Sequence, residues 1–342
     1  MNGLRLSVVM ANYNHGRILG QAVKEILSQS FSPYEVIIID DGSTDDSIKV
    51  IERIARENPN ANIKFLRNNQ NQGAVYSFNR GLREASGQYI YFAAADDTVF
   101  PGFFENSMRL LAKYPNAGLC SLMMKTICAD GTNVRMPLKN PSPVECYLNP
   151  VECLRLLRQY DSWMGGNSCI YRRDVVLECG GYLPELGPTC DIFLGMLVAL
   201  KYGVCFIPKQ LAGFRLSPDS YSATFLDLKV YSYTANLMKT TYADLFPVDY
   251  ANSWERRMMY RDTISAIKQL YKRQINMMED VLSQKNSVDK FFFLSMKLGM
   301  HMQLMFLIFY FLLRLGPDLR IVLQRGLLIK IRYLKARFCP QN

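Results

Sequence analysis

The chain has 342 residues, of which 49% are hydrophobic, so it is long enough to bury a substantial core and is not expected to be disordered. Its 40 Lys and Arg residues exceed its 30 Asp and Glu residues, which favours phosphorylated ligands, anionic membranes or polyanions as partners. The nine cysteines are scattered without a C-x-x-C spacing, which argues against a zinc site or a disulfide framework and is typical of a reducing compartment.

The N-terminal apolar run, residues 4–10, is too short for the core of a secretory signal and leads directly into a strand-loop pattern. No small-residue cleavage site follows it. We therefore expect the N-terminal domain to stay in the cytoplasm.

The first hundred residues alternate short apolar runs with segments of helical period, which is typical of βαβ units. We expect strands at 6–10, 36–39, 63–66 and 89–92, with helices at about 17–30, after Asp45 or Asp46, and at about 74–85. The continuous apolar run 36–39 indicates a parallel strand buried on both faces. Right-handed crossovers then predict an α/β fold with a doubly wound, mostly parallel sheet.

Polar residues follow each of these strands, at 12–15, 40–43, 68–73 and 96–97. In a doubly wound sheet the ligand crevice lies beyond the carboxyl ends of the strands. Asp96 and Asp97 could hold a hard divalent cation that also binds a diphosphate. Asp41 could bond a base or ribose, and Tyr13 offers a flat face to a base. An Asp pair after a strand also occurs as a structural turn cap, so this pair alone leaves both interpretations open.

The second half contains shorter predicted elements. Four prolines between residues 137 and 150 predict a surface loop. We expect a strand at 167–171, a helical turn at 174–178, and a helix at 189–201 with Thr189 as a plausible cap. Beyond residue 222 the pattern is helical.

The C-terminal region joins an apolar run to a basic stretch. Residues 302–313 are almost wholly apolar, but about 20 residues are needed to span a bilayer. Seven Arg and Lys residues follow, opposed only by Asp318. The region from about 291 to 338 is therefore predicted to lie on an anionic membrane surface. A solvated basic face on a helix that packs against the domain is the alternative.

The segments 7–14, 26–31 and 35–45 together resemble the family 2 glycosyltransferases of GT-A fold. The similarity continues through Asn71-Gln72-Gly73, Asn79-Arg80-Gly81, 87–90 and Asp96-Asp97, and more loosely to about residue 222. It implies a GT-A domain over 1–222, with a nucleotide-sugar half at 1–100 and an acceptor half at 101–222. A helical, membrane-associating extension would occupy 223–342.

The resemblance implies an inverting transfer of a sugar from a nucleotide-sugar, with a UDP-sugar expected, to a hydroxyl of a glycan or polyprenyl-linked acceptor. The expected setting is cell-surface polysaccharide synthesis by a peripheral enzyme on the inner face of the plasma membrane. It implies Asp97 as the principal ligand of Mn²⁺ or Mg²⁺, with Asp96 in support. The implied donor site comprises Ala11, Tyr13, Asn14, Asp41, Gly73 and Asp96. Ala94 departs from the family by replacing the first carboxylate of a Leu-Asp-Ala-Asp-Asp version.

The acceptor half carries a Gly180-Gly181-Tyr182 segment before Asp191, which matches the place of the family's general base. Asp191 is therefore the predicted base, although it could simply stabilise a helix N-terminus. Cys190 stands where relatives carry a second acidic residue. Trp163 and Arg215 are predicted acceptor residues, with core packing and a salt bridge as their alternatives.

Four other functions fit less of the sequence. A processive polysaccharide synthase normally carries a Gln-x-x-Arg-Trp motif, and a Rossmann oxidoreductase carries G-x-G-x-x-G after its first strand; neither motif is present. A non-catalytic sugar-binding or membrane scaffold relative that has lost metal binding is suggested by Ala94. Nucleic-acid binding would explain the basic tail but not the acidic strand ends, so no nucleic-acid partner is predicted.

Overall fold

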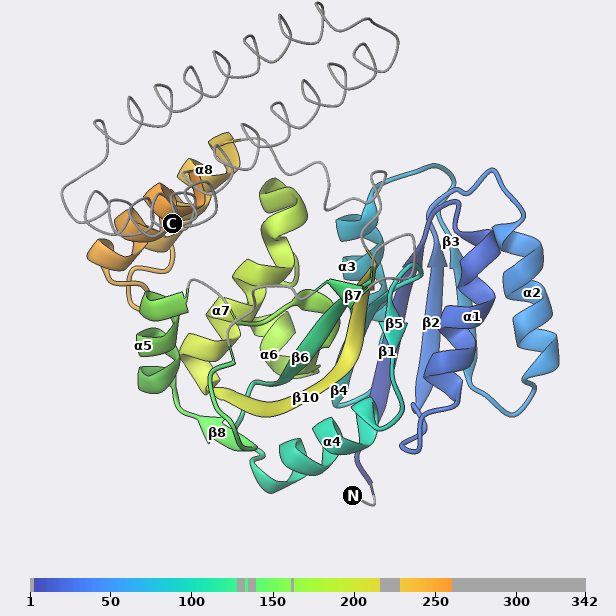
Figure 1. Ribbon diagram of the computed structural model, residues 1–342. Coiled ribbons are helices and arrows are strands. Elements are labelled where there is room, and N and C mark those ends of the chain that lie inside the picture. The colour runs from blue at the N-terminus through green and yellow to red at the C-terminus, as the bar shows by residue number, and fades with distance from the viewer. Residues whose placement is uncertain (1–2, 128–132, 135–139, 161–162, 216–227, 260–342) are drawn as a thin grey trace, which may run out of the picture. The chain divides into compact units, whose positions relative to one another are not determined.

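The computed structural model describes residues 3–127, 133–134, 140–160, 163–215 and 228–259 (Figure 1). The chain divides into two compact units, Met1–Tyr260 and Arg261–Asn342, and every described residue belongs to the first. The segment at about 291–338, predicted to lie on a membrane, is outside the described residues. Within the described ranges, none of the helices has both the length and the apolar character needed to cross a bilayer.

The described chain builds one sheet with helices on both faces. Its strands are β1 Leu6–Asn12, β2 Glu35–Asp40, β3 Ile63–Arg67, β4 Tyr89–Ala94, β5 Thr98–Val99, β6 Leu119–Ile127, β7 Asn133–Val134, β8 Cys146–Leu148, β9 Cys169–Arg172 and β10 Val204–Arg215. The helices are α1 Gly16–Leu27, α2 Ser47–Glu57, α3 Ala74–Glu84, α4 Phe103–Lys113, α5 Pro150–Tyr160, α6 Arg173–Glu178, α7 Cys190–Tyr202 and α8 Leu228–Lys239. Short 3₁₀ helices occupy Gly166–Ser168 and Pro184–Thr189, and a further helix begins at residue 248.

The strands follow the order β3-β2-β1-β4-β9-β6-β10-β5. The first four pair in parallel, which confirms the predicted βαβ units. Beyond β4 the sheet is mixed, because β9 pairs antiparallel with both β4 and β6 while β10 runs parallel to β6. The predicted mostly parallel sheet therefore describes the first half, and the second half differs from it through β9 and through the short antiparallel strands β5, β7 and β8.

Alternate strand residues enter two separate buried layers. Val8 and Met10 pack with α1, α2 and α4 on one face, whereas Val9 and Phe92 pack with the layer that contains α3 and α5 to α8 on the other (Figure 1). Because the central strands are covered on both faces, their sequences are continuously apolar and their carboxyl ends are held rigidly.

The helical residues after 228 belong to the same core as the sheet. Tyr231, Phe246, Tyr250 and Trp254 are all buried in the layer that includes α7. The domain end expected at residue 222 lies among residues 216–227, outside the described residues, and the first compact unit continues past it to Tyr260.

The amino end of the sheet is fastened by Glu35, whose side chain is fully buried. It accepts hydrogen bonds from the Ser7 hydroxyl and from the Ser86 amide and hydroxyl, each at 2.7 Å, and pairs with Lys64 Nζ at 2.7 Å. Burial raises the pKa of Glu35, but Lys64 and the other donors outweigh burial and lower it from 4.5 to about 2. One carboxylate thus joins β1, β2, β3 and the turn before β4.

We predict that Glu35→Gln lowers the free energy of unfolding by about 3 kcal/mol at pH 7, because the charged form is the one that the fold stabilises. In the wild type this contribution is complete above pH 4.5 and is lost as the pH falls toward 2. Urea denaturation across this pH range measures both effects. Glu52→Gln, on the exposed side of α2, is the matched control and should change stability little. An unchanged denaturation midpoint for Glu35→Gln would contradict this account.

Candidate active site

The carboxyl ends of β1, β2 and β4 meet at one edge of the sheet. Asn12 aligns with Asp40 across β1 and β2, and Ala11 aligns with Ala94 across β1 and β4. The sequence prediction that polar strand ends share one edge is therefore confirmed for these strands. Ala11, one of the predicted donor residues, lies at this edge and is partly exposed.

The loop after β1 is ordered by hydrogen bonds to the loop after β2. Asn14 adopts a left-handed backbone with φ 56°, and its side-chain oxygen accepts hydrogen bonds from the amides of Thr44 at 2.8 Å and Asp45 at 3.3 Å. The Ser43 hydroxyl accepts a bond from the Asn14 amide at 2.9 Å. Asn14 therefore fixes the loop, and the neighbouring Tyr13 side chain stays 40% exposed, which leaves its ring available to a ligand.

Asp41 is only 3% exposed and already accepts three hydrogen bonds from the protein. Asn68 Nδ2 and the Gln72 amide donate to Oδ1 at 2.6 and 2.9 Å, and the Gly73 amide donates to Oδ2 at 2.8 Å. Gly73, with φ 91°, then leads into α3. Asp41 thus holds the start of α3 against β2. Its contact with a nucleotide-sugar stays a prediction.

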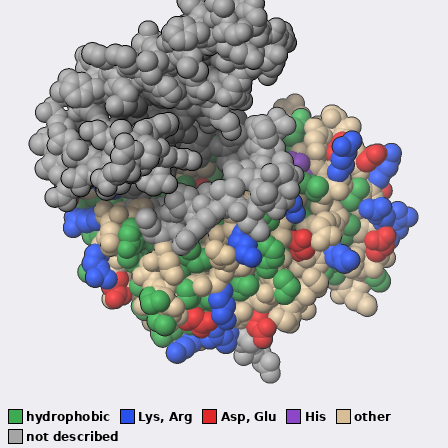
Figure 2. All heavy atoms as spheres, viewed as in Figure 1, with side chains coloured by type: hydrophobic (Ala, Val, Ile, Leu, Met, Phe, Trp, Pro, Cys, Tyr) green, Lys and Arg blue, Asp and Glu red, His purple; other side chains and the backbone are tan. Residues whose placement is uncertain are grey.

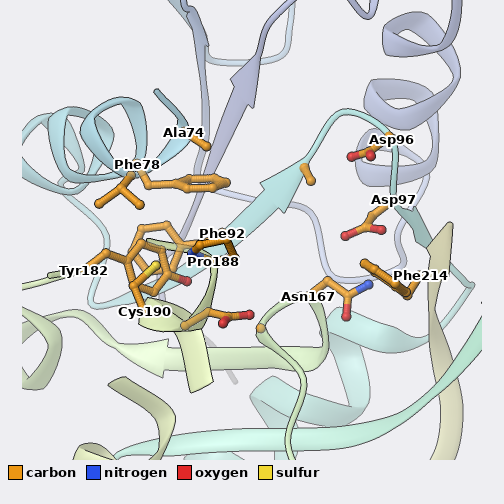
Figure 3. A pocket seen from close by; sticks show the side chains of 14 residues that line it. Ala74, Phe78, Phe92, Asp96, Asp97, Asn167, Tyr182, Pro188, Cys190 and Phe214 are labelled. Atoms are coloured by element: carbon orange, nitrogen blue, oxygen red, sulfur yellow. The ribbon is translucent and has the colours of Figure 1, made fainter. Parts of the chain in front are cut away.

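A cavity of about 180 Å³ lies beyond the end of β4. Its carboxylate and amide side chains are Asp96, Asp97, Asn167 and Asp191. Figure 3 shows Asp96, Asp97 and Asn167 together on one side of this pocket. The fold therefore brings the predicted metal pair and the predicted base, about a hundred residues apart in the chain, to the same pocket.

Asp97 is held by β10 and by the 3₁₀ turn at Gly166–Ser168. The amide of Arg215 donates to Asp97 Oδ1 at 3.4 Å, and Asn167, which also donates to the Gly213 carbonyl at 3.3 Å, hydrogen-bonds the Asp97 side chain. Burial, with the negative charge of Asp96 in second place, raises the pKa of Asp97 well above its ordinary value. Two crowded carboxylates of this kind are stabilised by a cation.

Asp96 and Asp97 suit a metal ion that is also coordinated by a substrate. Among the described residues, no group of three or more His, Cys, Asp and Glu side chains is arranged to enclose a metal ion. Asp96 and Asp97 would thus supply two carboxylates at most. Mg²⁺, and by analogy Mn²⁺, is ordinarily held by one or two carboxylates, with substrate phosphates and water completing its shell. The pair therefore suits a cation that binds together with a diphosphate.

Asp191 opens α7 and is oriented by main-chain donors. The Ile192 amide donates to Oδ1 at 2.7 Å, and the Gly166 amide also hydrogen-bonds the carboxylate. A Cβ atom at position 166 would collide with Asp191 Oδ2, so glycine permits this close approach. Burial raises the pKa of Asp191 to about 6 despite these hydrogen bonds. A carboxyl group with such a pKa can act as a general base near neutral pH.

The prediction that Trp163 forms an acceptor platform is wrong for this structure. Its side chain is fully buried in the same core as α7, so protein atoms cover the face that a sugar would need. Core packing, the alternative, describes this residue. Arg215 lies beside the pocket, where Nη2 donates to Thr98 Oγ1 at 3.0 Å; its contact with an acceptor or phosphate stays a prediction.

Sequence reasoning missed several pocket residues. It did not single out Asn167, although this residue directly follows two glycines, and it did not single out Phe78, Phe92 or Phe214. The three phenylalanines come from α3, β4 and β10, and no spacing in the sequence indicates that such distant residues meet.

The fold and the arrangement of this site can be compared with known proteins. Residues 7–179 match the family model described as Glycosyl transferase family 2, which is more than half of the chain. The chain belongs to glycosyl transferase family 2. Because the match includes β1 to β4 and Asp96-Asp97, the predicted resemblance is confirmed.

Among the relatives of this family 2 protein is the GalNAc(5)-diNAcBac-PP-undecaprenol beta-1,3-glucosyltransferase of Campylobacter jejuni. It is 32% identical over 105 residues, which are 31% of this chain and 33% of the relative. The chain spans between one third and one half of the length of the first curated relatives it matches.

Two solved structures share the fold. TarS of S. aureus, residues 1–349 in complex with UDP, aligns over 75% of this chain and 70% of its own with a TM-score of 0.55 and 17% identity. The mannosyltransferase PcManGT of Pyrobaculum calidifontis, in complex with GDP-Man and Mn²⁺, aligns over 82% and 81% with a TM-score of 0.54 and 16% identity. At these identities the similarity shows the GT-A-like fold alone.

We predict that Asp191→Asn stabilises the family 2 domain at pH 8. The raised pKa means that the native state holds the proton more tightly, so the carboxylate destabilises the fold by up to about 3 kcal/mol once the pH exceeds 6. Asparagine stays neutral and keeps the oxygen that accepts from Ile192. The expected gain is about 1–3 kcal/mol at pH 8 and close to nothing at pH 4, measured by urea denaturation. Asp244→Asn, at an exposed position, should give no gain, and a destabilised Asp191→Asn protein at pH 8 would refute the assignment.

Proposed function

We propose that the protein is an inverting glycosyltransferase that moves a sugar from a nucleotide-sugar donor, a UDP-sugar, to a hydroxyl of a glycan or lipid-linked glycan. The observation that carries the proposal is that Asp96, Asp97 and Asp191 line one pocket. The first two suit a diphosphate and its cation, and the third suits a hydroxyl that must lose its proton. The UDP complex of TarS and the undecaprenol-linked relative support the donor and acceptor classes.

The residues of the chain have distinct tasks in a single displacement. Asp191 takes the proton of the acceptor hydroxyl as its oxygen bonds to the anomeric carbon, while the bond from that carbon to the diphosphate oxygen breaks. Attack opposite the leaving group inverts the anomeric configuration. A divalent cation such as Mn²⁺ or Mg²⁺, held by Asp97 and Asp96, would neutralise the leaving diphosphate. The Arg215 amide and Asn167 keep Asp97 in place, and the Gly166 and Ile192 amides orient Asp191.

The proposed acceptor also suggests where the enzyme works. An undecaprenol-linked glycan is confined to a membrane, and the basic and apolar stretch at about 291–338 would attach the enzyme peripherally to an anionic surface. We place it on the cytoplasmic face of the plasma membrane, in the synthesis of cell-surface polysaccharide. This part of the proposal is supported by sequence composition and the relative's name.

A non-catalytic sugar-binding or scaffold protein is the second candidate, since Ala94 lies in the pocket wall and provides no ligand. A screen of nucleotide-sugars for donor hydrolysis, with and without Mn²⁺, separates the two functions. An enzyme releases UDP only from its own donor and in the presence of the cation, whereas a scaffold releases none.

We predict that Asp97→Asn reduces metal-dependent donor hydrolysis at least a hundredfold, because the substitution removes a charged ligand from the cation. The release of the nucleoside diphosphate measures the rate. Asp46→Asn, an exposed residue at the start of α2, is the matched control and should keep full turnover. Intact metal-dependent turnover in Asp97→Asn would show that the cation lies elsewhere.

We also predict that the transfer rate follows the ionisation of Asp191. The base must be deprotonated, so the rate should rise about tenfold per pH unit up to pH 6 and level off above it. Asp191→Asn should lose a hundredfold or more and show no such rise. Full transfer by this variant, or a rate that falls from pH 5 to 7, would assign the base to another residue.

A further inference from the structure

The pocket that holds Asp97 and Asp191 has a polar and an apolar side. Figure 3 shows Phe78, Phe92 and Tyr182 gathered opposite Asp96 and Asp97. The ring centroids of these three residues lie 4.7 to 5.7 Å apart, so each ring is fixed by the other two. We call this group the aromatic wall. It is a preformed apolar surface within the reacting pocket.

The aromatic wall should discriminate between sugars by the substituent that faces it. Most carbons of a pyranose ring carry a hydroxyl group. The phenylalanine rings of the wall and the neighbouring Ala94 and Pro188 have no side-chain donor or acceptor to replace the water that such a hydroxyl loses. An unpaired hydroxyl is disfavoured by roughly one to two orders of magnitude in affinity. A substituent that ends in a methyl group gains from the same contact.

Tyr182 gives the aromatic wall one hydrogen-bonding group. The residue is 3% exposed and lines the pocket, and within the described ranges its hydroxyl has no hydrogen-bond partner. Its main chain is fixed to α3 by two bonds, since Asn79 Nδ2 donates to the Tyr182 carbonyl at 2.7 Å and the Tyr182 amide donates to Asn79 Oδ1 at 2.9 Å. Buried phenols normally find a partner, so this rigidly placed hydroxyl is available to a ligand.

The proposed reaction places the transferred sugar against this wall. Its anomeric carbon must lie between the leaving diphosphate, at Asp97, and the acceptor oxygen, at Asp191. Both residues line the same cavity of about 180 Å³. This is smaller than the roughly 300–1,000 Å³ of sites that enclose a whole small ligand, so the cavity suits one sugar residue of the donor.

We propose that the transferred sugar is an N-acetylated amino sugar, an inference that rests on the proposed function. Its acetamido methyl group packs against Phe78 and Phe92, and its acetamido carbonyl accepts a hydrogen bond from the Tyr182 hydroxyl. A plain hexose has a hydroxyl in place of this group, so it lacks both the methyl group and the carbonyl oxygen that make these contacts. Tyr182, with its two neighbours, thus determines donor specificity.

The test compares two donors that differ only at this substituent. The full chain, with Mn²⁺, is titrated calorimetrically with UDP, UDP-glucose and UDP-N-acetylglucosamine. We expect the acetylated donor to bind at least tenfold more tightly than UDP-glucose. Tyr182→Phe should reduce this preference about fivefold and leave the affinity for UDP unchanged. Tyr233→Phe, an exposed tyrosine of α8, is the matched control and should preserve the preference.

The other outcomes are distinct. Equal affinity for the two donors, with UDP bound, would overturn this inference and leave the proposed function standing. The same would follow if Tyr182→Phe lowered the affinity for both UDP-sugars equally, since the Tyr182 hydroxyl would then not distinguish the acetamido group from a hydroxyl. Tighter binding of UDP-6-deoxyglucose than of the acetylated donor would assign the wall to a deoxy sugar and refute the proposal. A failure of UDP and both donors to bind would overturn the proposed function together with this inference.

Discussion

Like charges held in a small, partly buried pocket are the constraint on which the rest of this site depends. Asp97 lies beside Asp96 and is hard to ionise, and Asp191 in the same pocket has a pKa of about 6. Neither carboxylate has an ion-pair partner among the described residues. Asp97 is held by the Arg215 amide and by Asn167, and Asp191 is held by the Ile192 and Gly166 amides. Amides fix the direction of a carboxylate without neutralising it. The charge of Asp97 is therefore left for a cation to neutralise, and the carboxylate of Asp191 is left to take up a proton.

The opposite end of the same sheet shows what a structural carboxylate looks like in this fold. Glu35 is fully buried, but Lys64 and three further hydrogen bonds lower its pKa to about 2. Glu35 thus stabilises the fold, whereas the charges of Asp97 and Asp191 are not balanced by a neighbouring positive charge. Asp41 belongs with Glu35, because three donors from the protein surround it. Any effect of Asp41 on the binding of a nucleotide-sugar would thus act partly through Gly73 and the position of α3.

The sequence predicted the nucleotide half better than the acceptor half, for physical reasons. Parallel strands covered on both faces must be continuously apolar and must end in polar loops, so β1 to β4 and the residues after them are visible in the pattern. The antiparallel β9 is short, and its direction depends on distant partners. Thr189 occupies the predicted cap position, but its hydroxyl donates to the Leu186 carbonyl instead of capping α7. The burial of Trp163 and the closeness of Gly166 to Asp191 likewise follow from tertiary packing.

Ala94 and Cys190, the two departures from the expected family pattern, both affect the charge of the pocket. Ala94 and Cys190 occupy the two positions at which the resemblance implies a carboxylate, and both line the cavity with Asp96, Asp97 and Asp191. Burial raises the pKa of the Cys190 thiol, and Asp191 raises it further, so the side chain is neutral and adds no charge. Two more carboxylates here would repel the existing three and would place polar groups next to the aromatic wall. The uncharged side chains of Ala94 and Cys190 therefore keep the negative charge of this pocket to that of Asp96, Asp97 and Asp191, and leave its other side apolar.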